Sequence, residues 1–213
     1  MEWEQLLHIV GHEPVFETGL LLAGDVDPAG VYRQLSRWVR AGRLYQLRRG
    51  LYALAPPYQK VRPHPYVVAG ALVPGSYVSL QSALSEYGLI PEMVPQVTSV
   101  SAARPGRWDT PFGTFLFHHI KPELVYGYHA WALGGQQRAR IARPEKALLD
   151  LVYLTPGGDS LAYLRELRLQ QLERLDLDTL QELAVRADSP KLLRAADRVA
   201  LLVREEHLAY ELL

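Results

Sequence analysis

The chain has 213 residues, of which 48% are hydrophobic and 22% charged, so it can bury a core as one large domain or two small ones. This composition excludes wholesale disorder, and the absence of cysteine excludes disulfide scaffolds, zinc ribbons and thiol catalysis. The acidic start MEWEQLL is unlike a secretory signal, and the longest apolar stretch, residues 66–73, is too short to span a bilayer. We therefore expect a soluble, cytoplasmic protein with no membrane partner.

Positive charge is concentrated in one block near the N-terminus. Residues 1–26 carry five acids and no base, whereas residues 27–62 carry eight bases and one acid, a net charge of +7. Such a block is an electrostatic footprint that the zero net charge of the whole chain conceals. It favours a polyanionic partner for this segment, although a basic helix face is most often only a solvated surface.

Helical spacing of apolar residues predicts a short helix over residues 2–10 and a second over residues 15–23 that ends near Gly24. A third helix is predicted to begin at Asp27 and Pro28, an N-cap followed by a proline at the first helical position. It is expected to continue to about residue 41, with Gly42 as the C′ residue. The third of these helices forms the first part of the basic block.

The next segment, RLYQLRRGLYAL, is predicted to form a β-hairpin. Two short apolar runs, residues 44–47 and 51–54, flank Arg48, Arg49 and Gly50, and the glycine suits a turn position with positive φ. Four prolines between residues 56 and 65 then make a stiff connector. Three helices followed by a basic-tipped hairpin is the order of a winged helix-turn-helix.

The sequence therefore predicts a mixed α/β (α+β) protein with two domains. Residues 1–57 form a winged helix-turn-helix, residues 58–65 a proline-rich linker, and residues 66–213 a helix-rich mixed domain with a small sheet. Within the second domain the predicted helices are residues 66–72, 80–87 and 144–154, and the predicted strands are residues 96–102, 113–120 and 137–142. From residue 159 onward the pattern is helical, with breaks near residues 175–176 and 188–190.

The third helix is a candidate DNA-recognition helix. Arg33, Arg37 and Arg40 fall within about 60° of one another on a helical wheel, opposite the apolar side, and form one exposed stripe. A helix of this width fits the major groove, and a neighbouring Gln34 suits a bidentate contact to adenine. We expect base contacts from Arg33, Gln34 and Arg37.

Further basic residues extend this surface. The residues expected to serve the phosphate backbone or a minor groove are Arg40, Arg43, Arg48, Arg49 and Lys60. Six to eight such cations would give about micromolar non-specific affinity with a steep salt dependence.

At this point the sequence resembles a known family. The run VYRQLSRWVRAGRLYQLRRGLYAL, residues 31–54, resembles the N-terminal domain of AbiEi-type antitoxins of type IV toxin–antitoxin systems. PGSYVSLQSALSEYGLIP, residues 74–91, and IARPEKALLDLVYL, residues 141–154, resemble recurring features of that family's C-terminal domain. Their order and spacing also agree, so the resemblance spans most of residues 15–155.

The resemblance implies a transcriptional autorepressor whose winged-helix domain binds double-stranded DNA at repeats in its own promoter. It further implies an antitoxin activity, centred on the C-terminal domain, that opposes a cognate nucleotidyltransferase-like toxin without a stable complex. The family also includes members with no evident toxin neighbour. A stand-alone regulator whose C-terminal domain binds a ligand or a protein therefore remains an alternative.

A DNA-tethered nuclease is the remaining alternative, because Glu145, Lys146 and Asp150 bring two acids and a lysine together. These residues fall on a predicted helix rather than a strand, and Lys146 and Asp150 are expected to form an ordinary i,i+4 surface pair. His118 and His119, adjacent on a predicted strand, point to opposite faces and cannot chelate one ion together. We expect no enzyme activity, no catalytic residue, no metal site and no cofactor.

Overall fold

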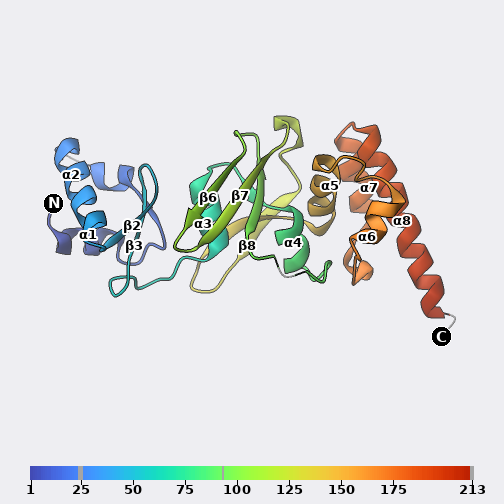
Figure 1. Ribbon diagram of the computed structural model, residues 1–213, viewed down its shortest axis with the longest axis horizontal. Helices are drawn as coiled ribbons and strands as arrows, with labels where there is room; N and C mark the ends of the chain where they lie inside the picture. The colour runs from blue at the N-terminus through green and yellow to red at the C-terminus, as the bar shows by residue number, and fades with distance from the viewer. Residues whose placement is uncertain (24–25, 93, 212–213) are drawn as a thin grey trace.

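The computed structural model describes residues 1–23, 26–92 and 94–211. It is elongated, with the chain termini at opposite ends (Figure 1). Three parts follow one another along the long axis, namely a small N-terminal unit, a central sheet with its helices, and a helical C-terminal end. The predicted mixed α/β class is confirmed.

The N-terminal unit has the element order of a winged helix. Its elements are α1 (Trp3–Val10), β1 (Phe16–Glu17), the 3-10 helix η1 (Thr18–Leu22), α2 (Pro28–Arg40), β2 (Leu44–Arg48) and β3 (Leu51–Leu54). The three strands form an antiparallel sheet in the order β1-β3-β2. The hairpin β2–β3 is the predicted wing, and Gly50 at its turn has φ +80°, as the positive-φ requirement predicts.

The prediction of a second helix over residues 15–23 is wrong, because this segment forms a short strand and a 3-10 helix. Phe16 and Glu17 are a strand that pairs with Tyr52 and Leu51 of the wing, and only the 3-10 turn η1 follows it. The backbone N–H of Thr18 also donates to Gly50 O at 2.9 Å. Pairing with a strand that is distant in the sequence determines the structure of this segment, because its local helical spacing is weaker than the tertiary pairing. The predicted end near Gly24 lies outside the described residues.

Helix α2 begins and ends as its sequence predicts. The Asp27 carboxylate accepts hydrogen bonds from the backbone N–H of Ala29 at 3.0 Å and of Gly30 at 2.9 Å. Pro28 occupies the first helical position, and Gly42, with φ +68°, follows the last turn. The buried side of the helix consists of Val31, Leu35 and Trp38. The opposite face is therefore presented to solvent.

The C-terminal part, residues 65–211, is built on a six-stranded mixed sheet in the order β6-β7-β5-β4-β9-β8. Its strands are β4 (Tyr77–Val78), β5 (Val97–Ser101), β6 (Gly106–Thr110), β7 (Gly113–His119), β8 (Tyr128–Ala132) and β9 (Arg138–Ala142). The helices are α3 (Pro65–Leu72), α4 (Leu80–Glu86), α5 (Pro144–Leu154), α6 (Leu161–Glu166), α7 (Leu177–Arg186) and α8 (Pro190–Glu211), with 3-10 turns η2 (Pro122–Leu124) and η3 (Leu172–Arg174). Helix α3 packs on β4, β5 and β9, whereas α5 joins the sheet to α7 and α8.

Three strands of this sheet, β4, β6 and β8, were not predicted from the sequence. Strand β6 lies in the turn-rich segment 103–111, and it is an edge strand that pairs only with β7 and leaves both faces partly exposed. Strand β8 is the other edge, and β4 has only two residues. Edge and very short strands carry little of the apolar alternation from which a strand is predicted. The predicted small sheet is therefore larger than expected.

The wing strand β3 is buried on both faces. Leu51 and Ala53 belong to the hydrophobic core of the C-terminal part, whereas Tyr52 and Leu54 belong to the core of the N-terminal unit. This is the alternation of a strand with a core on each side. The residue ranges predicted for the two domains and their linker stay a prediction, and the structure adds that the two parts share the wing.

A second contact between the parts passes through the linker. The Gln137 side chain, in the β8–β9 turn, accepts from the backbone N–H of His64 at 2.9 Å and donates to Arg62 O at 3.0 Å. The rings of Tyr45 on β2 and Phe112 in the β6–β7 turn meet edge to face, with centroids 6.0 Å apart. The winged unit is therefore held to the C-terminal part at several points.

Lys146 and Asp150 form a buried ion pair, which corrects the predicted surface pair. Their side chains are 4% and 2% exposed, because α5 packs between the sheet and the C-terminal helices. The Asp150 carboxylate accepts from Lys146 Nζ, from Tyr77 Oη at 3.0 Å and from Ser79 Oγ at 2.7 Å. Burial raises the pKa of this carboxyl group, and the ammonium and the two hydroxyl donors oppose that rise. The pair ties β4 to α5 inside the core.

Removing the carboxylate leaves the Lys146 ammonium buried without its partner. We expect Asp150→Ala to lower the free energy of unfolding by about 3–5 kcal/mol, measured by urea denaturation of the full chain. The control is Glu205→Ala, which removes the partner of Arg165 from an exposed pair with an N···O distance of 3.1 Å. The control is expected to change stability little. Equally small losses in both variants would contradict the structural role of Asp150.

Candidate nucleic-acid interface

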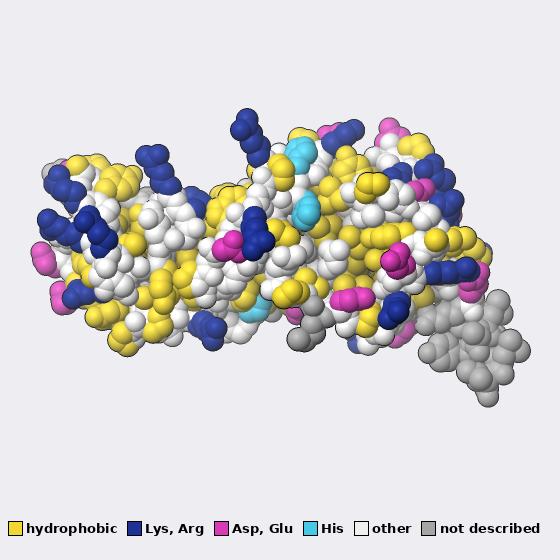
Figure 2. All heavy atoms as spheres, in the orientation of Figure 1, with side chains coloured by type: hydrophobic (Ala, Val, Ile, Leu, Met, Phe, Trp, Pro, Cys, Tyr) yellow, Lys and Arg dark blue, Asp and Glu magenta, His cyan; other side chains and the backbone are white. Residues whose placement is uncertain are grey.

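The exposed face of α2 carries the predicted arginine stripe. Arg33, Arg37 and Arg40 are all exposed and lie on the side opposite the buried residues of the helix. Figure 2 shows lysine and arginine side chains gathered over the α2 end of the molecule, with a further basic side chain projecting near the wing. The helix geometry therefore brings the three arginines together as the sequence predicts.

Two residues of this face were not singled out by the sequence. Tyr32, with 50% of its surface exposed, and Ser36 line a shallow hollow of about 480 Å³ together with the three arginines of the stripe. Their positions follow from the same spacing, since Ser36 is four residues from both Tyr32 and Arg40. Looking at every exposed position of the helix, rather than at its charges alone, would have found them. The face thus offers an aromatic ring and a hydroxyl group beside three guanidinium groups.

The stripe arginines are weakly engaged within the protein. Arg33 Nη2 lies 3.4 Å from the Asp27 carboxylate in a pair whose side chains are 68% and 65% exposed. Arg40 Nε donates to Ser36 O at 3.4 Å. Exposed ion pairs of this kind contribute little to stability. A phosphate or a base edge can therefore replace these partners at little cost.

Gln34 lies on the flank of the stripe and is half-buried. It is outside the set of residues that line the hollow on α2. Its predicted contact to adenine stays a prediction, and the structure places it farther from the centre of the exposed face than Arg37.

The two arginines of the hairpin have different surroundings. Arg48 is at the end of β2, where Nη2 lies 2.8 Å from Glu17 Oε1 and where Nε and Nη2 donate to Ala71 O at 3.3 and 3.1 Å. Its side chain is only 27% exposed. Arg49 is exposed in the turn itself. Arg48 thus contacts β1 and the end of α3, whereas Arg49 projects from the wing.

Arg43 and Lys60 are placed differently from each other as well. The Arg43 guanidinium lies over the ring of Trp3, 5.2 Å from its centroid, and the side chain is half-buried. Lys60 is exposed, and its ammonium group lies next to Gly11, directly after α1. The predicted set of eight residues therefore divides into an exposed group of arginines on α2 and the wing tip, the half-buried Gln34 on the flank of α2, two arginines engaged in packing, and Lys60 beside α1.

Comparison with known families shows what this unit is similar to. Residues 17–55 match the family described as "Transcriptional regulator, AbiEi antitoxin". The AbiEi resemblance is confirmed over this segment. The match covers the last residue of β1, then η1, α2 and the wing, so the stripe, Arg48 and Arg49 all lie within the AbiEi-like segment. The resemblance of residues 74–91 and 141–154 stays a prediction.

The whole chain also has a similar solved fold. The crystal structure of the RV2827C protein from Mycobacterium tuberculosis superposes with a TM-score of 0.52, at 16% identity, over 94% of this chain and 80% of that chain. At this identity the likeness concerns the fold alone. No curated protein sequence matches the chain.

Outside the AbiEi-like segment, the acids of α5 are engaged in packing. Glu145 is 4% exposed and accepts from the backbone N–H of Asp176 at 2.9 Å, and Asp150 is buried as described. In the described part of the chain, no three His, Asp or Glu side chains lie close enough together to hold a metal ion. Among the same residues, no helix is both long and apolar enough to cross a bilayer.

Because Arg48 and Arg49 have different surroundings, we expect their removal to affect stability to different extents. We expect Arg48→Ala to lower the free energy of unfolding by about 1–2 kcal/mol, because Glu17 and Ala71 O lose a charged hydrogen-bonding partner. The matched variant Arg49→Ala is expected to leave stability nearly unchanged. Chemical denaturation of the two full-length variants measures both effects. A greater loss for Arg49→Ala than for Arg48→Ala would contradict the placement.

Proposed function

We propose that the protein is a sequence-specific, DNA-binding transcriptional repressor of its own promoter. The observation that carries this proposal is the exposed face of Arg33, Arg37 and Arg40 on α2 of a winged-helix unit. The match of residues 17–55 to a family of transcriptional regulators supports the same conclusion. In this proposal α2 enters the major groove and the wing lies beside the adjacent backbone or minor groove.

Each of the eight predicted DNA-binding residues has a proposed role that follows from its surroundings. Arg33 and Gln34 lie near the middle of α2 and Arg37 lies in its last turn. In this proposal all three read base edges, with Arg37 the principal one. Arg40, Arg49 and Lys60 contact phosphates or the minor groove. Arg43 and Arg48 chiefly hold the recognition surface in shape, through Trp3 and through Glu17 with Ala71, and add to its positive potential.

We further propose that the protein acts as the antitoxin of a type IV toxin–antitoxin system. The family described for residues 17–55 supports this role. The functional antagonist would be a nucleotidyltransferase-like toxin that forms no stable complex with the protein. The protein would then work in the cytoplasm, where its promoter lies, and would do so without enzymatic activity or a cofactor.

A stand-alone regulator is the second candidate function. It is favoured by a cleft in the C-terminal part between β7, α4 and α5, a region far from the α2 face. In a regulator of this kind the C-terminal part binds a ligand or a protein, and no toxin is needed.

The nuclease alternative has less support, because Asp150 is buried and its carboxylate is hydrogen-bonded to Lys146, Tyr77 and Ser79. Magnesium-dependent DNA cleavage that is lost in Asp150→Asn would support it.

The decisive experiment is a binding titration on the DNA upstream of the protein's own gene and on scrambled DNA, at two salt concentrations. We expect preferential binding to the promoter and a steep loss of affinity at the higher salt, because phosphate contacts release counterions. We expect Arg37→Ala to weaken promoter binding by about 1–3 kcal/mol while it changes scrambled DNA far less.

Lys60→Ala is the control for sequence independence. It removes a phosphate contact in this proposal, so it is expected to weaken binding to both DNAs by similar factors and to lower the salt slope by about one. Equal losses on both DNAs for Arg37→Ala would remove Arg37 from base reading. Weak and equal binding of the native protein to both DNAs would overturn the repressor proposal itself. If a nucleotidyltransferase-like toxin gene adjoins the protein's own gene, co-expression of the two then tests the antitoxin role separately.

A further inference from the structure

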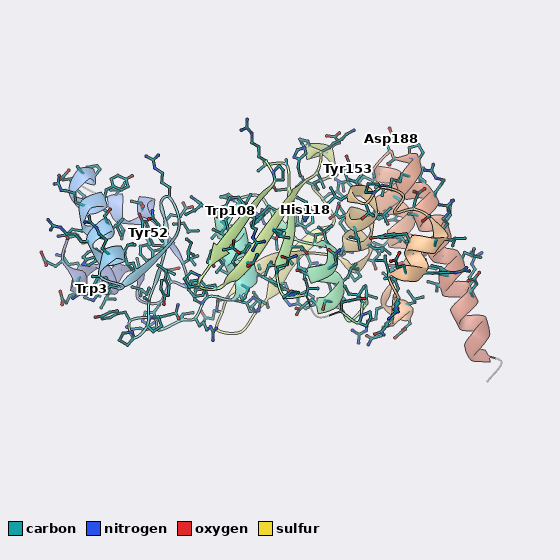
Figure 3. The ribbon with its side chains drawn as sticks, in the orientation of Figure 1. Trp3, Tyr52, Trp108, His118, Tyr153 and Asp188 are labelled. Carbon is teal, nitrogen blue, oxygen red and sulfur yellow. The ribbon has the colours of Figure 1, made fainter. Side chains whose placement is uncertain are left out.

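The C-terminal part contains a cleft that the DNA-binding face does not use. It has a volume of about 460 Å³, within the usual range for small-molecule sites. Its walls include Leu80 on α4, Leu116 and His118 on β7, and Leu151 on α5, and they are completed by β5 and the segment that precedes it. Figure 3 shows His118 on the side of the sheet toward α5, the helix on which Tyr153 is labelled. The cleft thus lies where the sheet meets the helical end of the molecule.

The lining is mostly apolar and carries no formal charge among the described residues. Its polar groups are amides, hydroxyls and one imidazole, including Gln81, Gln96 and His118. Burial lowers the pKa of His118, because desolvation favours the neutral ring. Burying a charged ligand group without a charged partner is costly, whereas neutral donors and acceptors are matched by these amides and this ring. The chemistry of the walls therefore selects an uncharged ligand.

One wall of the cleft is held in an unusual conformation. Leu80 has φ +58°, a left-handed backbone that is costly for a leucine, and its side chain is buried. The preceding Ser79 is fixed on both sides, because its hydroxyl donates to Asp150 at 2.7 Å and its carbonyl accepts from Thr98 Oγ1 at 2.8 Å. Such a conformation persists only where its surroundings over-determine it. The buried Lys146–Asp150 pair thereby fixes the shape of the cleft wall.

From this geometry we propose that the cleft between α4, β7 and α5 binds a small, uncharged, largely apolar molecule that carries an amide or a similar neutral hydrogen-bonding group. Leu116 and Leu151 contact its apolar body. Gln81, Gln96 and His118 satisfy its polar group. The proposal does not depend on DNA binding, and it gives the C-terminal part a site of its own.

The test uses the full-length protein and two probes of the same shape, benzamide and benzoate. Each is titrated while the imidazole resonances of His118 are followed by NMR, with the assignment taken from the spectrum of His118→Gln. We expect benzamide to shift these resonances in a saturable way, with benzoate at least about tenfold weaker. Benzoate that binds as well as benzamide, or no saturable shift with benzamide, would overturn the proposal.

Two cleft variants and one control variant locate the site. Gln81→Lys places a cation on the wall, and it is expected to admit benzoate, whereas the matched change Gln181→Lys on α7 is expected to leave the preference for benzamide unchanged. Leu116→Trp fills the cleft and is expected to abolish benzamide binding, with circular dichroism as the check on folding. If Gln81→Lys and Gln181→Lys behave alike, the probes bind elsewhere and the proposal fails. Promoter binding, measured in parallel, keeps this outcome separate from that of the repressor proposal.

Discussion

The double burial of strand β3 is the constraint on which the rest of the structure depends. A four-residue strand gives Leu51 and Ala53 to one core and Tyr52 and Leu54 to the other, so neither core is complete without it. The winged unit and the C-terminal part are thereby fixed to each other through the wing, rather than linked by a flexible connector. Separating them would expose apolar surface that is covered in the intact chain, at roughly 25 cal/mol for each Å² of apolar area.

In the repressor that we propose, this arrangement would affect how the molecule meets DNA. In a free-standing winged unit the wing can adjust to the groove, whereas here one of its faces is occupied and Arg48 bonds to Ala71 at the end of α3. The spacing between the α2 face and the wing tip is therefore fixed in the protein alone, which would reduce the conformational entropy lost on binding DNA. The same contact gives the C-terminal part a physical connection to the recognition surface.

The features that sequence reasoning predicted well are those decided by nearby residues. The cap at Asp27, the first-turn proline, Gly42 and the Gly50 turn each need only a few neighbours, and helix spacing alone brings the arginine stripe together. The features it missed depend on distant partners. Phe16 and Glu17 became a strand because β3 was there to pair with them, and Lys146 and Asp150 became a core pair because other elements cover α5. Local spacing carries no information about such coverage.

Local spacing also does not show which basic side chains are bonded inside the protein. A count of basic residues therefore overestimates how many of them are available for recognition. An arginine has five donors, and a donor already bonded inside the protein cannot be given to a phosphate without a loss elsewhere. Arg48 is committed to Glu17 and Ala71, and Arg43 lies over Trp3, while the α2 stripe holds only weak, exposed contacts. In the proposed function, specificity would therefore rest on the few guanidinium groups whose internal partners are easily replaced. Charge would steer the encounter with DNA, and the availability of donors would decide which residues can read it.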